Sequence, residues 1–220
     1  MAKVAKVTVR KAEQTKQADE VEIPDIETQI VPIHIVGISP LIVNNFSEKQ
    51  KEDIKDKPMP GGAVPKRAQR PPRDPEAEYQ RARILDVHGK DCIPVRWFKA
   101  SLVTAAGLTD KMISMKMVKA TVFVLGDTTP IVGSPVRMRE DTVRVGMGKA
   151  DLRYRPMFRQ WSATLDITYV TSQLDLDSLV SLVNAGGMGV GVGEWRPEKR
   201  GEFGTFALDV NHDIEIIRGE

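Results

Sequence analysis

A run of glycines near the C-terminal end most constrains what this chain can fold into. Five of its 17 glycines fall within eight positions, namely Gly186, Gly187, Gly189, Gly191 and Gly193. Before the run, residues 176–183 place apolar side chains at i, i+3, i+4 and i+7, the pattern of an amphipathic helix that Gly186 or Gly187 would end. After it, residues 203–210 alternate as a strand does. The predicted order is therefore helix, glycine loop, strand.

That order argues against a nucleotide-binding enzyme. Dinucleotide-binding and Walker loops run strand, loop, helix, and they hold phosphate at the helix N-terminus. Here the loop follows a helix C-terminus, whose partial negative charge disfavours anions. The sequence also lacks the Gly-x-x-x-x-Gly-Lys-Ser/Thr motif. We therefore expect no nucleotide cofactor, nor any other cofactor.

The other periodic segments complete an α+β fold. Residues 31–43 mark a first core strand, and residues 94–106 share an apolar helical face. Residues 119–125 and 161–170 alternate as strands. The order strand, helix, strand, strand, helix, strand is the βαββαβ order of the ferredoxin-like (RRM-like) plan, an antiparallel sheet with two helices on one face. The opposite face would be free to bind.

The hydrophilic stretches define the domain organisation. Residues 1–29 are charged and weakly patterned, and we expect a flexible N-terminal arm that orders on a partner. Residues 30–217 form a single ferredoxin-like domain. Two stretches, 44–92 and 126–160, are expected to project from its sheet as insertions.

Local signals predict some structure within the insertions. Asp74-Pro75 followed by two acids is typical of a helix start, so a short helix is expected to run to about residue 83. In the second insertion we expect short strands at 131–138 and 142–145.

The composition narrows the cellular setting. Cys92 is the single cysteine, which excludes an internal disulfide framework and a cysteine-cluster zinc site. No apolar run is long enough to span a bilayer, and residues 1–16 are polar and basic rather than a signal-peptide core. We expect a cytoplasmic protein with no membrane partner and no bound metal.

Basic residues are concentrated in the two insertions, although the net charge is only +2. The first insertion contains Lys66, Arg67, Arg70 and Arg73. Between positions 137 and 159 three acids accompany seven basic residues: Arg137, Arg139, Arg144, Lys149, Arg153, Arg155 and Arg159. Tyr154 lies among them. A single-strand groove needs cations along the phosphates and rings that stack on bases. The alternative is a solvated surface with core aromatics.

The glycine loop adds further candidate contacts. Backbone at Gly187, Gly189, Gly191 and Gly193 would approach a nucleic acid closely. Trp195 would stack on a base, and Arg196, Lys199 and Arg200 would meet phosphates. The alternative is that Trp195 packs over the loop and Arg196 pairs with Glu194 or Glu198.

Two motifs carry a family resemblance. Ile38-Ser39-Pro40-Leu41-Ile42-Val43 and the segment 186–204 resemble the RAMP superfamily of CRISPR proteins, in particular the backbone subunits that polymerise along guide RNA. The resemblance implies a ferredoxin-like core with a thumb-like insertion and a glycine-rich loop that touches RNA. It favours single-stranded RNA over DNA as the partner, and a homo-oligomer.

The same resemblance supplies two weak catalytic candidates in a chain that we otherwise expect not to be an enzyme. RAMP processing endonucleases often use a histidine near strand one, which would make His34 a general base. Some backbone subunits cleave with a metal-dependent loop aspartate, which points to Asp141. A simpler alternative for Asp141 is ion pairing with Arg139 or Arg144. The three histidines, His34, His88 and His212, are widely separated, and no zinc-protease or nucleophile-elbow motif occurs.

A second resemblance concerns origin. Residues 138–146, 150–155 and 191–198 are similar to segments of uncharacterised bacteriophage proteins. The leading hypothesis is then a phage-derived protein that coats or assembles along single-stranded RNA or DNA without catalysis. The alternative is a phage protein that binds another protein, in the virion or against host defence, and a third is a RAMP-type endoribonuclease.

Overall fold

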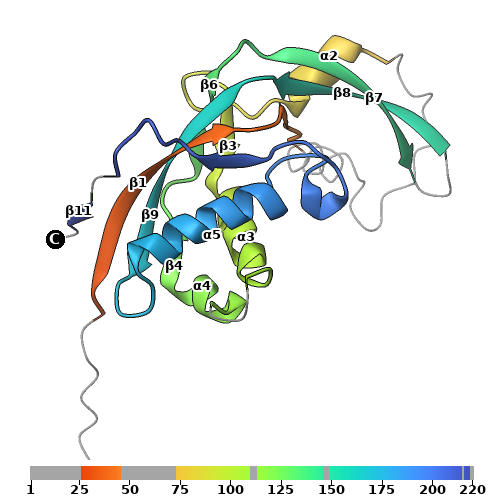
Figure 1. The fold of residues 1–220 in the computed structure, drawn as a ribbon. Helices are drawn as coiled ribbons and strands as arrows, with labels where there is room; N and C mark the ends of the chain where they lie inside the picture. Colours follow the sequence, from red (N-terminus) through yellow and green to blue (C-terminus); the bar gives the residue numbers. More distant parts are fainter. Residues whose placement is uncertain (1–25, 46–72, 110–112, 146–148, 215, 219–220) are drawn as a thin grey trace, which may run out of the picture.

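An antiparallel sheet forms the centre of the fold (Figure 1). The computed structural model describes residues 26–45, 73–109, 113–145, 149–214 and 216–218. The main strands are β1 (Thr28–Gly37), β4 (Val122–Val124), β9 (Trp161–Val170) and β10 (Phe206–Leu208). They lie in the order β10-β1-β9-β4, with all neighbours antiparallel.

This strand order confirms the predicted α+β, ferredoxin-like fold. The first and second main strands, β1 and β4, flank β9, while β9 and β10 flank β1. Each strand-helix-strand unit is therefore split by a strand of the other, which is the ferredoxin-like arrangement.

Two helices cover one face of the sheet, as Figure 1 shows. They are α3 (Val95–Ala106), between β1 and β4, and α5 (Leu176–Gly189), between β9 and β10. Alternate residues of β1 and β9 face them, and Ile33 and Ile35 are fully buried beneath them. Burial of each such side chain stabilises the fold by about 1.5–3 kcal/mol.

The segments outside this core build a second, smaller sheet. In it β2 (Leu41–Ile42) pairs with β8 (Lys149–Phe158), which forms a long hairpin with β7 (Arg137–Val145). Helix α2 (Pro75–Ala82) lies beside β8. Shorter strands complete the fold: β3 (Cys92–Pro94) pairs with β5 (Thr128–Pro130), β6 (Val132–Gly133) with β9, and β11 (Ile217–Arg218) with β1.

Side chains that cap helix N-termini explain where three helices begin. Asp74 accepts a hydrogen bond from the backbone N–H of Ala77 at α2, as its sequence pattern predicts. Asp175 caps α5 in the same way. Ser114 caps α4 (Met115–Thr121), a helix that the sequence pattern did not predict.

Four element boundaries predicted from periodicity were wrong. Residues 119–121 belong to α4, so the strand expected at 119–125 is confined to β4. Helix α5 does not end at Gly186 or Gly187 but continues to Gly189. The strand expected at 203–210 is confined to β10. The second insertion has strands of nine and ten residues, β7 and β8, because long-range pairing extends a hairpin past its locally alternating part.

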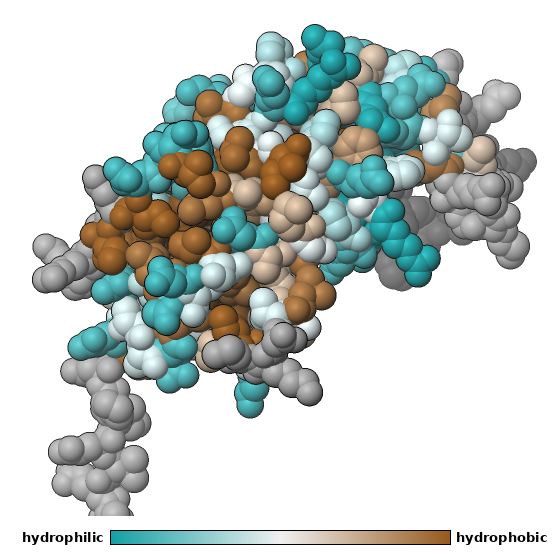
Figure 2. All heavy atoms as spheres, in the orientation of Figure 1, coloured by the Kyte–Doolittle hydropathy of each residue, from teal (hydrophilic) through white to brown (hydrophobic). Residues whose placement is uncertain are grey.

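Apolar and polar residues occupy different parts of the surface visible in Figure 2. Apolar atoms gather over the region where β1, β9 and β10 lie in Figure 1, and hydrophilic atoms predominate over α2 and the hairpin. Among the described residues, no helix combines the length and the apolar character needed to cross a membrane.

Candidate nucleic-acid interface

One face of the β7–β8 hairpin carries a row of arginines, which we call the arginine face. Residues directly opposite in an antiparallel pair share a face. Arg139 is opposite Arg155, Asp141 is opposite Arg153, and Arg137 is opposite Met157. Because successive side chains alternate in direction along both strands, Arg137, Arg139, Arg153 and Arg155 lie on one side, with Asp141 among them and Asp151 beside Arg153.

Asp141 is buried at the centre of this face. Its side chain is 8% exposed; Oδ1 accepts a hydrogen bond from Nε of Arg139 at 2.8 Å, and Oδ2 lies 3.8 Å from Nη1 of Arg155. The guanidinium of Arg139 also lies over the ring of Phe203, 4.7 Å from its centroid. These contacts give Asp141 the pairing role with Arg139 that the sequence left open as the simpler alternative.

A second ion-pair cluster joins the hairpin to the start of α2. Nη1 of Arg73 lies 2.9 Å from Oδ1 of Asp151, and Nε of Arg73 lies 2.8 Å from Oε1 of Glu78. Nη2 of Arg153 is 3.0 Å from Oδ2 of Asp151. Burial alone would raise the pKa of Asp151, but the charges of Arg153 and Arg73 outweigh it and hold that pKa below its usual value.

This lowered pKa predicts an acid-sensitive junction between α2 and the hairpin. A carboxylate whose folded pKa is depressed stabilises the fold above its unfolded pKa, and the contribution is lost as pH falls through the folded value. We expect Asp151→Asn to lower the urea midpoint of unfolding near neutral pH and to have little effect at a pH below the folded pKa. Asp166→Asn, at an exposed carboxylate on the other sheet, is the control. An equal effect of Asp151→Asn at both pH values would contradict the prediction.

The glycine loop is packed against the protein itself. Gly187, Gly191 and Gly193 are buried. The backbone N–H of Val192 donates to the carbonyl of Gly204, and that of Glu194 donates to the carbonyl of Ile42. A Cβ on Gly193, whose φ is +78°, would lie 2.5 Å from the carbonyl oxygen of Ile42. The expectation that these three glycines approach a nucleic acid is therefore corrected; of the four predicted, Gly189 is exposed.

The residues after the glycines are more accessible. Trp195 is 41% exposed and has a φ of +57°. Nη2 of Arg196 contacts Oε2 of Glu198, and Nη1 donates to the carbonyl of Gly193 at 3.0 Å, which matches the pairing alternative. Lys199, in the short 3-10 helix η1 (Pro197–Lys199), and Arg200 after it are exposed.

The remaining predicted basic residues are spread over the hairpin and beyond. Arg137 is exposed near one end of the hairpin and Arg159 at the turn into β9. Arg144 and Lys149 lie in the strands at its other end. Lys66, Arg67 and Arg70 lie outside the described residues, as does most of the predicted arm.

The uncovered face of the main sheet is a separate surface. Its β1 and β9 positions hold no lysine or arginine: they are Ile30, Pro32, His34, Val36, Ser162, Thr164, Asp166 and Thr168. His34 stacks on His212 with ring centroids 4.4 Å apart, and its Nδ1 lies 2.9 Å from Oγ1 of Thr164. His34 and Asp141, the two catalytic candidates, thus lie in different sheets. Among the described residues, the arginines of the candidate interface lie on and beside the hairpin rather than on this open face.

Sequence reasoning missed the partners that complete the candidate interface. Phe203, Glu78 and Asn44 belong to three segments far apart in the sequence, and each contacts a residue of the interface or the loop beside it. No local pattern marks them, because strand register and loop packing bring them together. Within the described residues, no group of three or more His, Cys, Asp or Glu side chains has an arrangement that would hold a metal ion.

Comparisons with known proteins add little to this geometry. The sequence matches no protein-family model, and no curated protein matches it. Among solved structures, Cmr6 from Pyrococcus furiosus aligns with 84% of this chain and 100% of its own, at 9% sequence identity and a TM-score of 0.43. A TM-score this low carries no argument about function, so the assignment of the fold rests on strand order.

Proposed function

We propose that this chain binds single-stranded nucleic acid along the arginine face and does not cleave it. The observation that carries the proposal is the convergence of Arg139, Arg153 and Arg155 on one side of a projecting hairpin. Arg73 joins them through Asp151. A guanidinium has five N–H donors, and a carboxylate partner occupies one or two of them. Arg153, which is partly exposed and paired with Asp151, therefore keeps donors for phosphate oxygens.

Aromatic side chains support a single-stranded rather than a duplex ligand. Phe203 lies beside Arg139, and Trp195 is exposed on the neighbouring loop. Rings next to cations suit unpaired bases, which stack on them. RNA is favoured over DNA, and assembly of several copies along one strand is favoured as well, through the family resemblance of the two sequence motifs. The bacteriophage origin stays a prediction.

Catalysis is the less favoured proposal. Asp141 is buried and hydrogen-bonded to Arg139, and His34 lies in the main sheet rather than on the hairpin. A nuclease would require one of them in the groove that binds the strand.

Titration of labelled strands tests the proposal. We expect fluorescence anisotropy to show binding to single-stranded RNA, weaker binding to DNA and duplex, and a steep loss of affinity with salt. Arg153→Ala should weaken binding and reduce the slope of log affinity against log salt by about one. Lys116→Ala is the control, because Lys116 is exposed on α4, at the other end of the molecule (Figure 1). An unchanged slope in Arg153→Ala would remove the arginine face from the interface.

A protein partner is the second candidate function. A hollow of about 460 Å³ lies between α5 and the segment leading to α4, and Ile113, Met117 and Leu174 contribute apolar lining. Nearby Leu108 is 62% exposed. If no strand binds at low salt, this surface becomes the leading candidate.

A further inference from the structure

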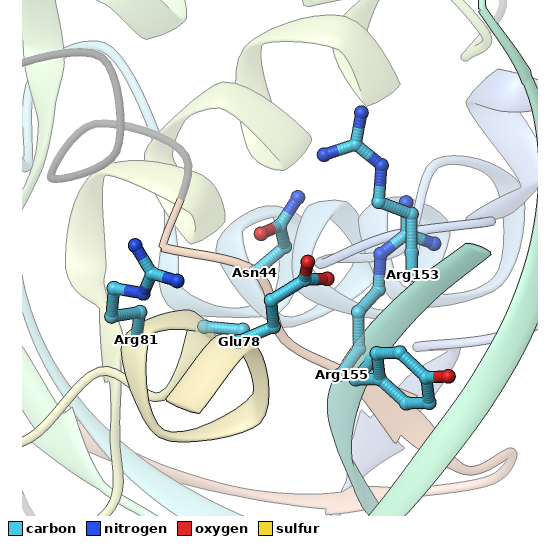
Figure 3. Close-up of a pocket in the computed structure, with 7 residues that line it drawn as sticks. Asn44, Glu78, Arg81, Arg153 and Arg155 are labelled. Carbon is cyan, nitrogen blue, oxygen red and sulfur yellow. The ribbon is translucent and has the colours of Figure 1, made fainter. Parts of the chain in front are cut away.

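A small pocket lies where the edge of β8 meets α2. It is lined by Asn44, Glu78, Arg81, Arg153 and Arg155, together with Ala82 and Tyr154. Figure 3 shows Asn44 and Glu78 between Arg81 on one side and Arg153 and Arg155 on the other. Three separate segments of the chain therefore meet around one space.

The size of the pocket limits what it can hold. Its volume is about 40 Å³. One ordered water needs roughly 10–15 Å³ of such volume. The space thus suits a group the size of a few water molecules, such as a phosphate, and is too small for a nucleobase.

The charge of the lining selects an anion. Three arginines face one carboxylate, and that carboxylate is already paired, because Nε of Arg73 lies 2.8 Å from Oε1 of Glu78. Asn44 has an amide nitrogen with two protons, of which one is directed to Oε1 of Glu194 at 3.2 Å. Planar guanidinium groups and an amide are the donors that bind phosphate oxygens.

Arg155 supplies an independent indication of a ligand. Its side chain is only 9% exposed, and its nearest carboxylate oxygen, Oδ2 of Asp141, is 3.8 Å away, beyond hydrogen-bond distance. Among the described residues, Nε and Nη1 of Arg155 are buried without a hydrogen-bond partner, as is Oδ2 of Asp141. Buried polar groups are nearly always paired, so Arg155, whose ion pair with Asp141 is too long for a hydrogen bond, has donors left for an anion in the adjoining pocket.

We propose that this pocket binds one phosphate group, held by Arg153, Arg155 and the amide of Asn44. The phosphate would come from the backbone of the strand, in which case the inference rests on the proposed function, or from free phosphate in solution. Either source presents the same tetrahedral anion to the arginines. Bound to a strand, the phosphate would fix the strand's register on the hairpin, since phosphate contacts position a nucleic acid.

The first test uses inorganic phosphate alone, without nucleic acid. The Nε–H signal of Arg155, identified by its absence from spectra of Arg155→Lys, is followed by ¹H–¹⁵N NMR as sodium phosphate is added, with sodium chloride at matched ionic strength as the control. We expect a saturable shift with phosphate only. Arg155→Lys keeps the charge beside Asp141 but loses the planar fork, so phosphate affinity should fall about tenfold to a hundredfold. No shift, or equal affinity in Arg155→Lys, would overturn the proposal.

A second variant guards against a folding defect. Asn44→Ala removes an amide from the other wall and leaves the buried ion pair intact, so it should also weaken phosphate binding, whereas Lys116→Ala should not. Equal phosphate affinity in Asn44→Ala and wild type would remove the amide from the site.

Competition separates the two sources of phosphate. If single-stranded RNA displaces inorganic phosphate, the pocket belongs to the nucleic-acid interface. If phosphate binds through Arg155 but no nucleic-acid strand binds, the phosphate pocket is supported and the proposed function is contradicted. If nucleic-acid strands bind and inorganic phosphate does not, the proposed function is supported and the phosphate pocket is contradicted.

Discussion

Gly187→Ala is expected to destabilise the protein by about 3 kcal/mol or more, the upper end of the range for overpacked cores. A Cβ at this position would lie 1.9 Å from the carbonyl oxygen of Phe206. That oxygen belongs to the backbone of β10. The same strand is held to α5 by the backbone N–H of Leu208, which donates a hydrogen bond to the side chain of Asn184. Helix and strand must therefore move apart. Urea denaturation monitored by circular dichroism gives the loss as a lower midpoint at constant slope.

Gly189→Ala provides the matched control two residues later in α5. Its Cβ would meet only the end of the exposed Leu108 side chain, at 2.8 Å, which can rotate away. Alanine is favoured over glycine in a helix by about 1 kcal/mol, so this variant should be neutral or slightly stabilising. Equal losses in both variants would mean that contact with β10 is not what makes alanine costly at position 187.

Asp141→Ala is expected to cost about 3–5 kcal/mol, the usual effect of removing one member of a buried ion pair. The substitution leaves the guanidinium of Arg155 buried with no carboxylate near it, and it deprives Nε of Arg139 of its partner. Thermal or urea unfolding measures the cost. Retention of wild-type stability would show that the carboxylate is not needed to balance the arginine face.

A double-mutant cycle separates this role from catalysis. In the Asp141→Ala background, Arg155→Met should cost much less than in the wild type, because the charge that it removes is already unpaired. Strand cleavage is then assayed with Asp141→Asn. If wild type cleaves and this variant does not while binding persists, the non-catalytic proposal is wrong.

Helices and strands that carry a distinct local pattern, such as a capping residue or a regular alternation, could be predicted from the sequence. Asp74-Pro75 predicts the start of α2, and the alternation over residues 161–170 coincides with β9. The order of these elements was enough to predict the ferredoxin-like plan. The helix at 115–121 was not predicted, because its seven residues, about two turns, are too few to show a distinct periodicity.

Only part of the candidate interface could be predicted from the sequence. Clustering of basic residues identified the second insertion, but only short strands at 131–138 and 142–145 were predicted there, and not the hairpin of β7 and β8. Pairing of Asp141 with Arg139 was among the alternatives expected from the sequence, whereas no local pattern indicates that Asp151 joins Arg73 to Arg153 across almost eighty residues of sequence. Such pairing depends on strand register and on where α2 lies, neither of which periodicity reports.

The glycine run shows most clearly the difference between what the local sequence determines and what tertiary packing determines. The sequence by itself determined that glycines cluster where a helix ends and the chain leads on to a strand, and that basic residues gather in the second insertion. The tertiary structure decided that Gly187 allows α5 to contact β10, that Gly193 allows the loop to contact Ile42, and that Asp141 and Arg155 are buried together. The reason is physical: helix and strand patterns arise between near neighbours in the chain, whereas close contacts and buried charges arise between segments that only the folded packing brings together.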